Sequence, residues 1–168
     1  FGVVISASHN DFLDNGIKIF NEDGEKISRN IEKRIEKYLS SELIPVETSA
    51  IGKAYRFDES GPRYIEFCKS TVPPVVNFSS LRIVLDCANG ASYKSAPKIL
   101  KFLGANLIVI GNKPNGFNIN KNCGSTFPIK IRRYVKKHKA DLGISLDGDA
   151  DRIIMCDEKG LIIDGDQI

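Results

Sequence analysis

The sequence predicts an α/β protein: a partial N-terminal α/β domain followed by a β-α-β-α-β domain with a mainly parallel sheet. The second domain is indicated by segments of helical periodicity that alternate with apolar strands at 81–85, 106–110 and 142–146. Such alternation favours parallel strands joined by right-handed crossovers. The boundary is indicated by residues 45–60, which are rich in small and polar side chains and lack sustained periodicity. We therefore expect domains at residues 1–57 and 58–168.

The N-terminal part should contain two strands and one helix. A β-branched run, Gly2–Ile5, and an alternating segment, Ile17–Phe20, are separated by loop and turn residues. Ser28 is suited to cap a helix whose apolar residues recur at helical spacing. We expect that helix to end near Leu43.

Three helices and a closing hairpin are predicted in the second domain. Pro62 suits the first turn of a helix that reaches Ser70, with Ile65 and either Cys68 or Phe67 facing inward. A second helix should run from 92 to 103, before Gly104, and a third should begin at Pro128. Two short apolar runs, 153–156 and 161–163, flank a turn and predict the hairpin.

Composition excludes several classes of function. The chain has 168 residues, 42% of them hydrophobic, and a formal net charge of +3, so it can build a core and carries no strong charge bias. The densest basic cluster, 132–139, falls on a predicted helix, where a solvated face is favoured over a nucleic-acid patch. No apolar run approaches a membrane span. We expect no nucleic-acid and no membrane partner.

Cysteine usage favours a cytoplasmic location. The four cysteines show no close pair and no metal-ligand spacing, as expected of free thiols: Cys68, Cys87, Cys123 and Cys156. No signal peptide is recognisable. The chain opens directly into an apolar strand at Phe1 and stops within a polar turn, so we expect it to be a fragment of a longer protein.

The strongest chemical signal is the carboxylate turn, Asp147-Gly-Asp-Ala-Asp-Arg152. Three aspartates two residues apart repel one another unless a cation lies among them, and hard oxygen ligands favour Mg²⁺, Ca²⁺ or Mn²⁺. The turn follows a predicted parallel strand, and ligands bind at the carboxyl ends of such strands. Asp147, Asp149 and Asp151 are therefore candidate metal ligands.

Two other interpretations of this turn are weaker. The aspartates and Glu158 match positions 1, 3, 5 and 12 of an EF-hand loop, but Arg152 stands where that loop needs glycine and both flanks predict strands. A solvent-facing polar turn without a ligand fits poorly with the apolar strands on either side.

A second candidate centre is the serine loop, Ser6-Ala-Ser-His-Asn10, at the end of the first strand. Its end-of-strand position could present the Ser8 hydroxyl rigidly. A serine hydrolase is disfavoured because the loop lacks a nucleophile-elbow pattern and because His9 should point away from Ser8 on an extended chain.

Together, the two centres suggest phosphoryl transfer. A phosphorylated Ser8 would add negative charge and acceptor oxygens, and a cation held by the carboxylate turn could take one of those oxygens as a ligand. Lys18 and Arg152 could supply cationic donors. Without further information, Lys18 would be interpreted as an exposed strand lysine.

The chain resembles the α-D-phosphohexomutases along its whole length. The resemblance rests on the serine loop, on Asn15-Gly-Ile-Lys18 and on the carboxylate turn. It is strengthened by three further segments, Asp86-Cys-Ala-Asn-Gly90, Asn115-Gly-Phe-Asn-Ile-Asn120 and Cys123-Gly-Ser125. Within the family, the chain is most similar to the bacterial branch that interconverts glucosamine 6-phosphate and glucosamine 1-phosphate, on the way to UDP-N-acetylglucosamine and peptidoglycan.

The resemblance implies a role for each site residue. Ser8 would be the phosphoserine that exchanges its phosphoryl group with the sugar phosphate through a bisphosphorylated sugar. Asp147, Asp149 and Asp151, with the Ser8 phosphate, would bind one Mg²⁺. By the same resemblance, Lys18 would handle the hydroxyl proton, His9 and Arg152 would orient the phosphate, and Ser6 would take part in self-phosphorylation.

The chain also departs from the family pattern. Asp11 stands where proline is usual, which frees the backbone and brings a negative charge near Ser8. Ala150 stands where many members have glycine, a change that we expect to be tolerated. The family has four domains, and the third and fourth, which carry the sugar-recognition and phosphate-binding loops, lie outside this chain. The isolated fragment should therefore be inactive.

Two alternatives remain open at this point. Within the same superfamily, the chain could belong to a phosphomannomutase or phosphoglucomutase. Outside it, Asp11 and the truncation would also fit a non-catalytic cation-binding remnant.

Overall fold

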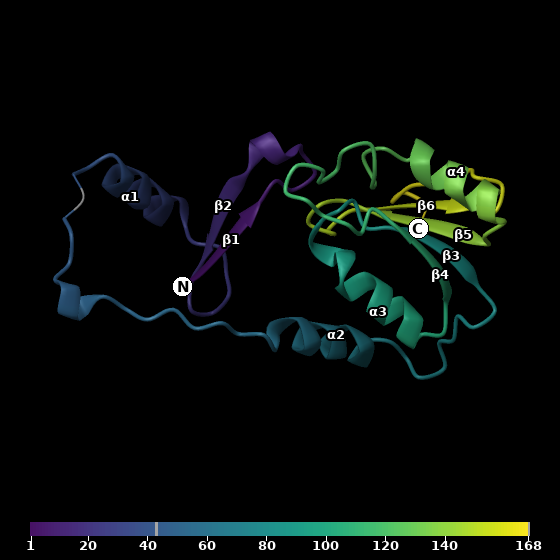
Figure 1. The fold of residues 1–168 in the computed structure, drawn as a ribbon, viewed down its shortest axis with the longest axis horizontal. Coiled ribbons are helices and arrows are strands. Elements are labelled where there is room, and N and C mark those ends of the chain that lie inside the picture. The colour runs from purple at the N-terminus through teal and green to yellow at the C-terminus, as the bar shows by residue number, and fades with distance from the viewer. Residues whose placement is uncertain (43, 168) are drawn as a thin grey trace. The chain divides into compact units, whose positions relative to one another are not determined.

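The computed structural model describes residues 1–42 and 44–167, which form two compact units (Figure 1). Unit 1 comprises Phe1–Ile5 and Ile17–Asp58, and unit 2 comprises Ser6–Gly16 together with the chain from Glu59 onward. The serine loop and the carboxylate turn thus belong to the same unit. The predicted domain limits, 1–57 and 58–168, stay a prediction.

Unit 1 contains the two predicted strands and the predicted helix. Strands β1 (Gly2–Ser6) and β2 (Gly16–Phe20) pair in a two-stranded sheet, followed by α1 (Arg29–Leu39) and the 3₁₀ turn η2 (Thr48–Ala50). Ser28 occupies the N-cap position of α1, but its side chain makes no capping hydrogen bond.

The end of α1 comes earlier than predicted. Ser40 Oγ donates to the Glu36 carbonyl and Ser41 Oγ to the Tyr38 carbonyl, and such side-chain bonds to the backbone compete with continuation of a helix. Leu43, the predicted end, lies outside the described residues.

Unit 2 contains a five-stranded sheet in the order β4-β3-β5-β6-β7. Its strands β3, β4 and β5 are parallel, whereas β6 and β7 add in antiparallel fashion as the predicted hairpin. Their bounds are Arg82–Asp86, Asn106–Ile110, Leu142–Leu146, Ile153–Asp157 and Ile162–Ile163. The structure confirms the predicted α/β fold with a mostly parallel sheet.

The helices of unit 2 cover both faces of this sheet. Figure 1 shows α4 and α3 on opposite sides of the strands, with α2 beside α3. The helical segments are α2 (Ser60–Ser70), η3 (Ala91–Tyr93), α3 (Ser95–Phe102) and α4 (Ile129–His138). The predicted helix over 92–103 is therefore interrupted near Lys94 and ends before Gly104, whose φ is +92°.

A small apolar core lies between α4 and the sheet. It consists of buried residues from β3, α4, the loop after α4 and β6: Val84, Ile131, Val135, Ala140 and Cys156. A Cβ atom on Gly143 of β5 would lie 2.6 Å from Ile131 Cγ1 and 2.8 Å from Cys156 Sγ. Glycine at that position therefore lets α4 approach the strand closely.

Helix α2 resolves an alternative left open by the sequence. Ile65 is buried and Cys68 is half-buried, whereas Phe67 is 63% exposed. Cys68 rather than Phe67 therefore accompanies Ile65 inward. Within the described part of the chain, the helices are too short or too polar to cross a membrane.

Candidate active site

The candidate site lies where β3 and β5 end and three loops meet. Ala91 N donates to the Gly148 carbonyl at 2.8 Å, so the loop after β3 is joined to the carboxylate turn after β5. Asn120 N donates to the Ala88 carbonyl at 2.9 Å, which adds the long loop after β4. The carboxyl ends of parallel strands therefore meet as predicted.

Asp86, the last residue of β3, holds two of these loops together. It is fully buried, and its carboxylate accepts hydrogen bonds from Ala88 N and Gly124 N, both at 3.0 Å. Both oxygens are thus occupied by backbone donors. Sequence reasoning included Asp86 only as part of a matching segment; the signal for its role was an acid at the end of an apolar strand.

Asp147 begins the carboxylate turn with a buried carboxylate. Its Oδ1 accepts from Asp151 N at 3.1 Å and Arg152 N at 3.2 Å. Its Oδ2 is buried and has no hydrogen-bond partner among the described residues. The pKa of Asp147 is raised above the usual carboxyl value, chiefly because burial penalises the charged form. The hydrogen bond from Arg152 N–H opposes this shift, and the Asp151 charge adds to it. A cation beside Oδ2 would offset that desolvation.

The other residues of the turn differ in environment. Asp149 accepts a hydrogen bond from Ser6 Oγ, whereas the side chains of Asp151 and Arg152 are exposed. Ala150 has a φ of +62°, in the left-handed region that glycine adopts at least cost. The chain accepts alanine there, at a conformational cost of about 1 kcal/mol.

The serine loop folds back on itself beside the carboxylate turn. Ser8 has a φ of +52°, its backbone N donates to Ser6 Oγ at 2.8 Å, and Asn10 N donates to the Ala7 carbonyl at 2.9 Å. Since Ser6 Oγ also donates to Asp149, one hydroxyl joins the two predicted centres. The structure thus brings Ser8 and the carboxylate turn together.

His9 lies differently from the sequence-based expectation. The left-handed conformation of Ser8 turns the chain, and His9 Nδ1 lies 3.5 Å from Ser8 Oγ. The prediction that His9 points away was wrong because it assumed an extended backbone, which a positive φ replaces. The ring is therefore close to the hydroxyl that would be phosphorylated.

Asp11 fits the loop without disturbing it. Its φ of −69° is close to the value that proline imposes, and its Oδ1 accepts from Leu13 N at 3.2 Å, capping the 3₁₀ turn η1 (Phe12–Asp14). The carboxylate therefore replaces the rigidity of proline with a local hydrogen bond. Asp11 remains exposed to solvent.

Lys18 lies on β2, in unit 1, and its side chain is half-buried rather than exposed. Its proposed part in proton transfer stays a prediction.

The donor set of the carboxylate turn fits a hard cation, although the side chains are not gathered around one point. Among residues 1–42 and 44–167, no three His, Cys, Asp or Glu side chains are grouped so that they could hold a metal ion. The partnerless Asp147 oxygen and the neighbouring Asp149 and Asp151 provide oxygen donors of the kind that Mg²⁺ prefers. Metal binding therefore remains a prediction.

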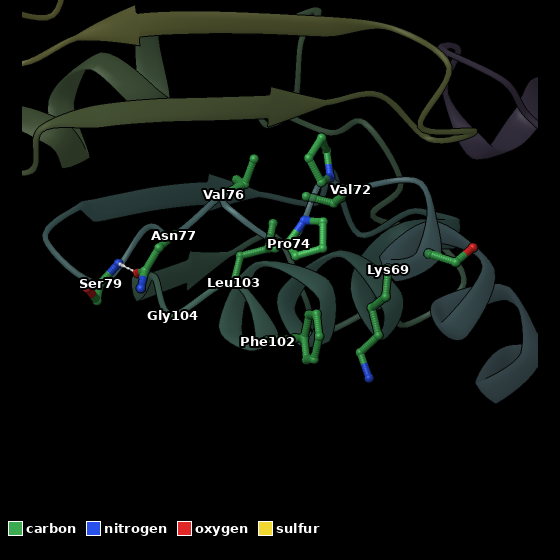
Figure 2. Close-up of a pocket in the computed structure, with 11 residues that line it drawn as sticks. Lys69, Val72, Pro74, Val76, Asn77, Ser79, Phe102, Leu103 and Gly104 are labelled. Carbon is green, nitrogen blue, oxygen red and sulfur yellow. Dashed lines mark hydrogen bonds between the residues drawn. The ribbon is translucent and has the colours of Figure 1, made fainter.

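A pocket of about 580 Å³ lies elsewhere in unit 2, beside the C-terminal ends of α2 and α3 (Figure 2). Pro74, Val76 and Phe102 line it, and Lys69 lies with its ammonium 4.3 Å above the Phe102 ring. Lys69 is also paired with Glu66 at 2.6 Å. None of the predicted site residues lines this pocket.

The resemblance to the phosphohexomutases predicted an α/β fold of this kind, and comparison with known families agrees. Residues 62–160 match the family described as "Phosphoglucomutase/phosphomannomutase, alpha/beta/alpha domain II", and residues 1–43 match the corresponding domain I. The chain belongs to the phosphoglucomutase/phosphomannomutase family.

Two curated relatives are identical to this chain at more than half of the aligned positions. The phosphoglucosamine mutase of Geotalea uraniireducens is 56% identical over 171 residues, covering 99% of this chain and 37% of the relative. That of Mesorhizobium japonicum is 54% identical over 169 residues, covering 99% and 38%. The chain thus spans well under half the length of these curated relatives.

Solved structures share the fold. A putative phosphomannomutase from Thermus thermophilus superposes with a TM-score of 0.69 at 24% identity, covering 96% of this chain and 37% of that structure. A phosphoglucomutase/phosphomannomutase family protein from Burkholderia thailandensis gives 0.67 at 24% identity, with 96% and 34% covered.

Proposed function

We propose that this chain supplies the phosphoserine and metal-binding part of a phosphoglucosamine mutase active site. The enzyme would interconvert glucosamine 6-phosphate and glucosamine 1-phosphate in the cytoplasm, providing amino sugar for UDP-N-acetylglucosamine and peptidoglycan. The observation that carries the proposal is the hydrogen bond from Ser6 Oγ to Asp149, which joins the serine loop to the carboxylate turn. The choice of sugar is supported by relatives named phosphoglucosamine mutase at 54–56% identity.

Ser8 would carry the transferable phosphoryl group. A sugar hydroxyl oxygen bonds to phosphorus while the bond from phosphorus to Ser8 Oγ breaks, and the hydroxyl proton passes to a base, for which we propose Lys18. The product is a bisphosphorylated sugar. After this sugar turns over, its other phosphoryl group returns to Ser8 Oγ, so phosphate is conserved in each cycle.

The carboxylate turn would hold the cation that this transfer requires. Asp147, Asp149, Asp151 and a phosphate oxygen on Ser8 would bind one Mg²⁺, which supplies neutralisation of the charge that develops on the phosphoryl oxygens. Ser6 would have to share Asp149 with that ion, since its hydroxyl donates to the same carboxylate.

His9 and Arg152 would orient the phosphate. The His9 ring lies 3.5 Å from the Ser8 hydroxyl and can donate to a phosphoryl oxygen placed on it. Arg152 is exposed at the end of the carboxylate turn and offers a planar cationic donor. Ser6 Oγ accepts a hydrogen bond from Ser8 N, and Ser6 remains our candidate for a part in self-phosphorylation.

The remaining partners are the sugar phosphate and two further domains. Because the chain covers only 37–38% of its relatives, we propose that third and fourth domains of the same protein recognise the sugar and its phosphate. The isolated 168-residue chain would then be inactive as a mutase.

Steady-state kinetics of the full-length protein that carries this chain test the proposal. We expect glucosamine phosphates to be converted faster than mannose or glucose phosphates, and Ser8→Ala to abolish turnover while the exposed-site control Ser41→Ala does not. Faster turnover of mannose or glucose phosphate would assign a phosphomannomutase or phosphoglucomutase. Full activity of Ser8→Ala would exclude the phosphoserine mechanism.

A further inference from the structure

Asn120 lies at the meeting point of the loops and is buried, with 9% of its surface exposed. It stands at the end of the Asn115–Asn120 segment in the long loop between β4 and α4. Its φ is +56°, and its backbone N donates to the Ala88 carbonyl at 2.9 Å. The residue is therefore fixed to the loop that follows β3.

The Asn120 side chain reaches into the serine loop. Its Nδ2 donates to the Ser8 carbonyl at 2.9 Å and to the Asn10 carbonyl at 2.8 Å. Ser8 and Asn10 are the two neighbours of His9 in the chain. The Asn120 amide therefore donates one N–H to the residue before His9 and the other N–H to the residue after it. The amide orientation is determined by this contact, because the opposite orientation would place an oxygen against two carbonyls.

A second contact comes from the same segment. The rings of Phe117 and Phe12 meet edge to face, with centroids 5.2 Å apart and planes at 83°. Phe12 begins the 3₁₀ turn that follows the serine loop. The segment that ends in Asn120 thus contacts the serine loop and the turn after it, although more than 100 residues separate them in sequence.

The serine loop needs such support. A serine at a φ of +52° is held in a conformation that costs about 1 kcal/mol or more, and it persists only where neighbouring groups determine it. The loop's own hydrogen bonds, from Ser8 N to Ser6 Oγ and from Asn10 N to Ala7 O, leave the Ser8 and Asn10 carbonyls to be satisfied. Asn120 is the side chain that satisfies both.

We propose that Asn120 is a positioning residue: it clamps the Ser8 and Asn10 carbonyls and so presents the Ser8 hydroxyl to the carboxylate turn. The inference rests on the proposed function for its catalytic consequence, because in-line phosphoryl transfer demands a fixed phosphate position. The clamp itself is a property of the loop and can be measured without turnover.

Hydrogen–deuterium exchange of the 168-residue chain tests the clamp. Asn120→Asp keeps the shape but removes both donors and places a carboxylate against two carbonyls. Asn122→Asp is the matched control, since Asn122 has a φ of +52°, lies two residues away and is exposed. We expect amides of residues 7–14 to exchange about 10- to 100-fold faster in Asn120→Asp, as loss of two hydrogen bonds implies, and unchanged in the control.

The same experiment reports whether the variant folds, through the protection of β3 and β5. If Asn120→Asp loses that protection, Asn120→Ala, which adds no charge, replaces it. Unchanged exchange of residues 7–14 in a folded Asn120 variant would overturn the clamp.

A kinetic readout separates positioning from a merely structural role. In the full-length protein, we expect Asn120→Ala to lower kcat about 10-fold or more. KM should change little, since the proposed third and fourth domains would bind the sugar phosphate. An unchanged kcat would overturn the positioning role. If wild-type Ser8 carries no phosphate while the exchange contrast is observed, the proposed function fails and the clamp stands.

Discussion

Gly148→Ala should separate the serine loop from the carboxylate turn. A Cβ atom on Gly148 would lie 2.8 Å from Asn120 Nδ2 and 2.9 Å from Ile119 Cδ1, and closer still to the Ser8 carbonyl oxygen. An ordinary carbon–oxygen contact is about 3.3 Å or longer. Gly148 is not in the left-handed region, so alanine meets no backbone penalty and the effect is one of space alone.

The added methyl group can be accommodated only if the serine loop moves by roughly 1 Å. Displacements of that size at a reacting group cost on the order of 100-fold in rate, and overpacking of a close contact costs about 1–3 kcal/mol in stability. We therefore expect kcat of the full-length protein to fall about 100-fold and the thermal midpoint of this chain to fall by several degrees.

Steady-state kinetics and thermal unfolding measure these two effects. Gly61→Ala is the control, because a Cβ atom at Gly61 would meet nothing within 4 Å and Gly61 has no positive φ. We expect that control to keep wild-type kcat and unfold at or slightly above the wild-type temperature. A wild-type kcat and thermal midpoint in Gly148→Ala would refute the close contact between Gly148 and the Ser8 carbonyl.

Four further predictions concern the metal, the Cys87 thiol and Asp11. Asp147→Asn should weaken Mg²⁺ binding about 10-fold or more in calorimetric titration, because it removes the anionic oxygen that has no other described partner. The control Asp58→Asn, at an exposed site, should leave Mg²⁺ affinity unchanged. Equal Mg²⁺ affinities of Asp147→Asn and the wild type would contradict the ligand assignment. Burial raises the pKa of Cys87 to about 12, so at pH 8 its alkylation should be far slower than that of half-buried Cys68, as peptide mapping would report; equal rates would be inconsistent with a buried thiol. Because unfolded chains release that thiol proton near its ordinary pKa of 9.0 and the folded chain retains it, the free energy of unfolding should fall as pH rises from about 9 towards 12; a denaturant midpoint that rises over this range would contradict the sign. Asp11→Pro should change the free energy of unfolding by no more than about 1 kcal/mol. Proline is compatible with the φ of −69° and lowers the entropy of the unfolded chain, which offsets loss of the Asp11 cap. A larger loss of stability on chemical denaturation would show that the loop differs from that described.

Much of the fold was predictable because its signals are local. The three parallel strands were recognisable as apolar runs of strand length, and Gly104 marked the end of a helix through the left-handed conformation that glycine adopts readily. The place of the carboxylate turn followed from topology alone, since parallel strands end at one edge of the sheet. Those inferences required no knowledge of side-chain contacts.

The site's internal arrangement was less predictable because it depends on the sign of φ at single residues and on hydrogen bonds between residues far apart in sequence. The positive φ of Ser8 reversed the expected direction of His9, and a serine gives little indication that it will adopt that conformation. The amide of Asn120 meets the serine loop across 112 residues of sequence. Such a contact cannot be inferred from periodicity or spacing.

The central claim is that Ser8 carries a phosphoryl group that moves to the sugar. The most direct test is to isolate the full-length protein with an isotope-labelled phosphate on Ser8, add excess unlabelled glucosamine 6-phosphate, and follow the label by mass spectrometry of the Ser8 peptide and of the sugar phosphates. We predict that the label leaves Ser8 and appears on glucosamine phosphates, while Ser8 regains unlabelled phosphate from the sugar in each cycle. A Ser8 peptide without phosphate in protein that turns over, or a label that stays on Ser8 while substrate is converted, would contradict the account.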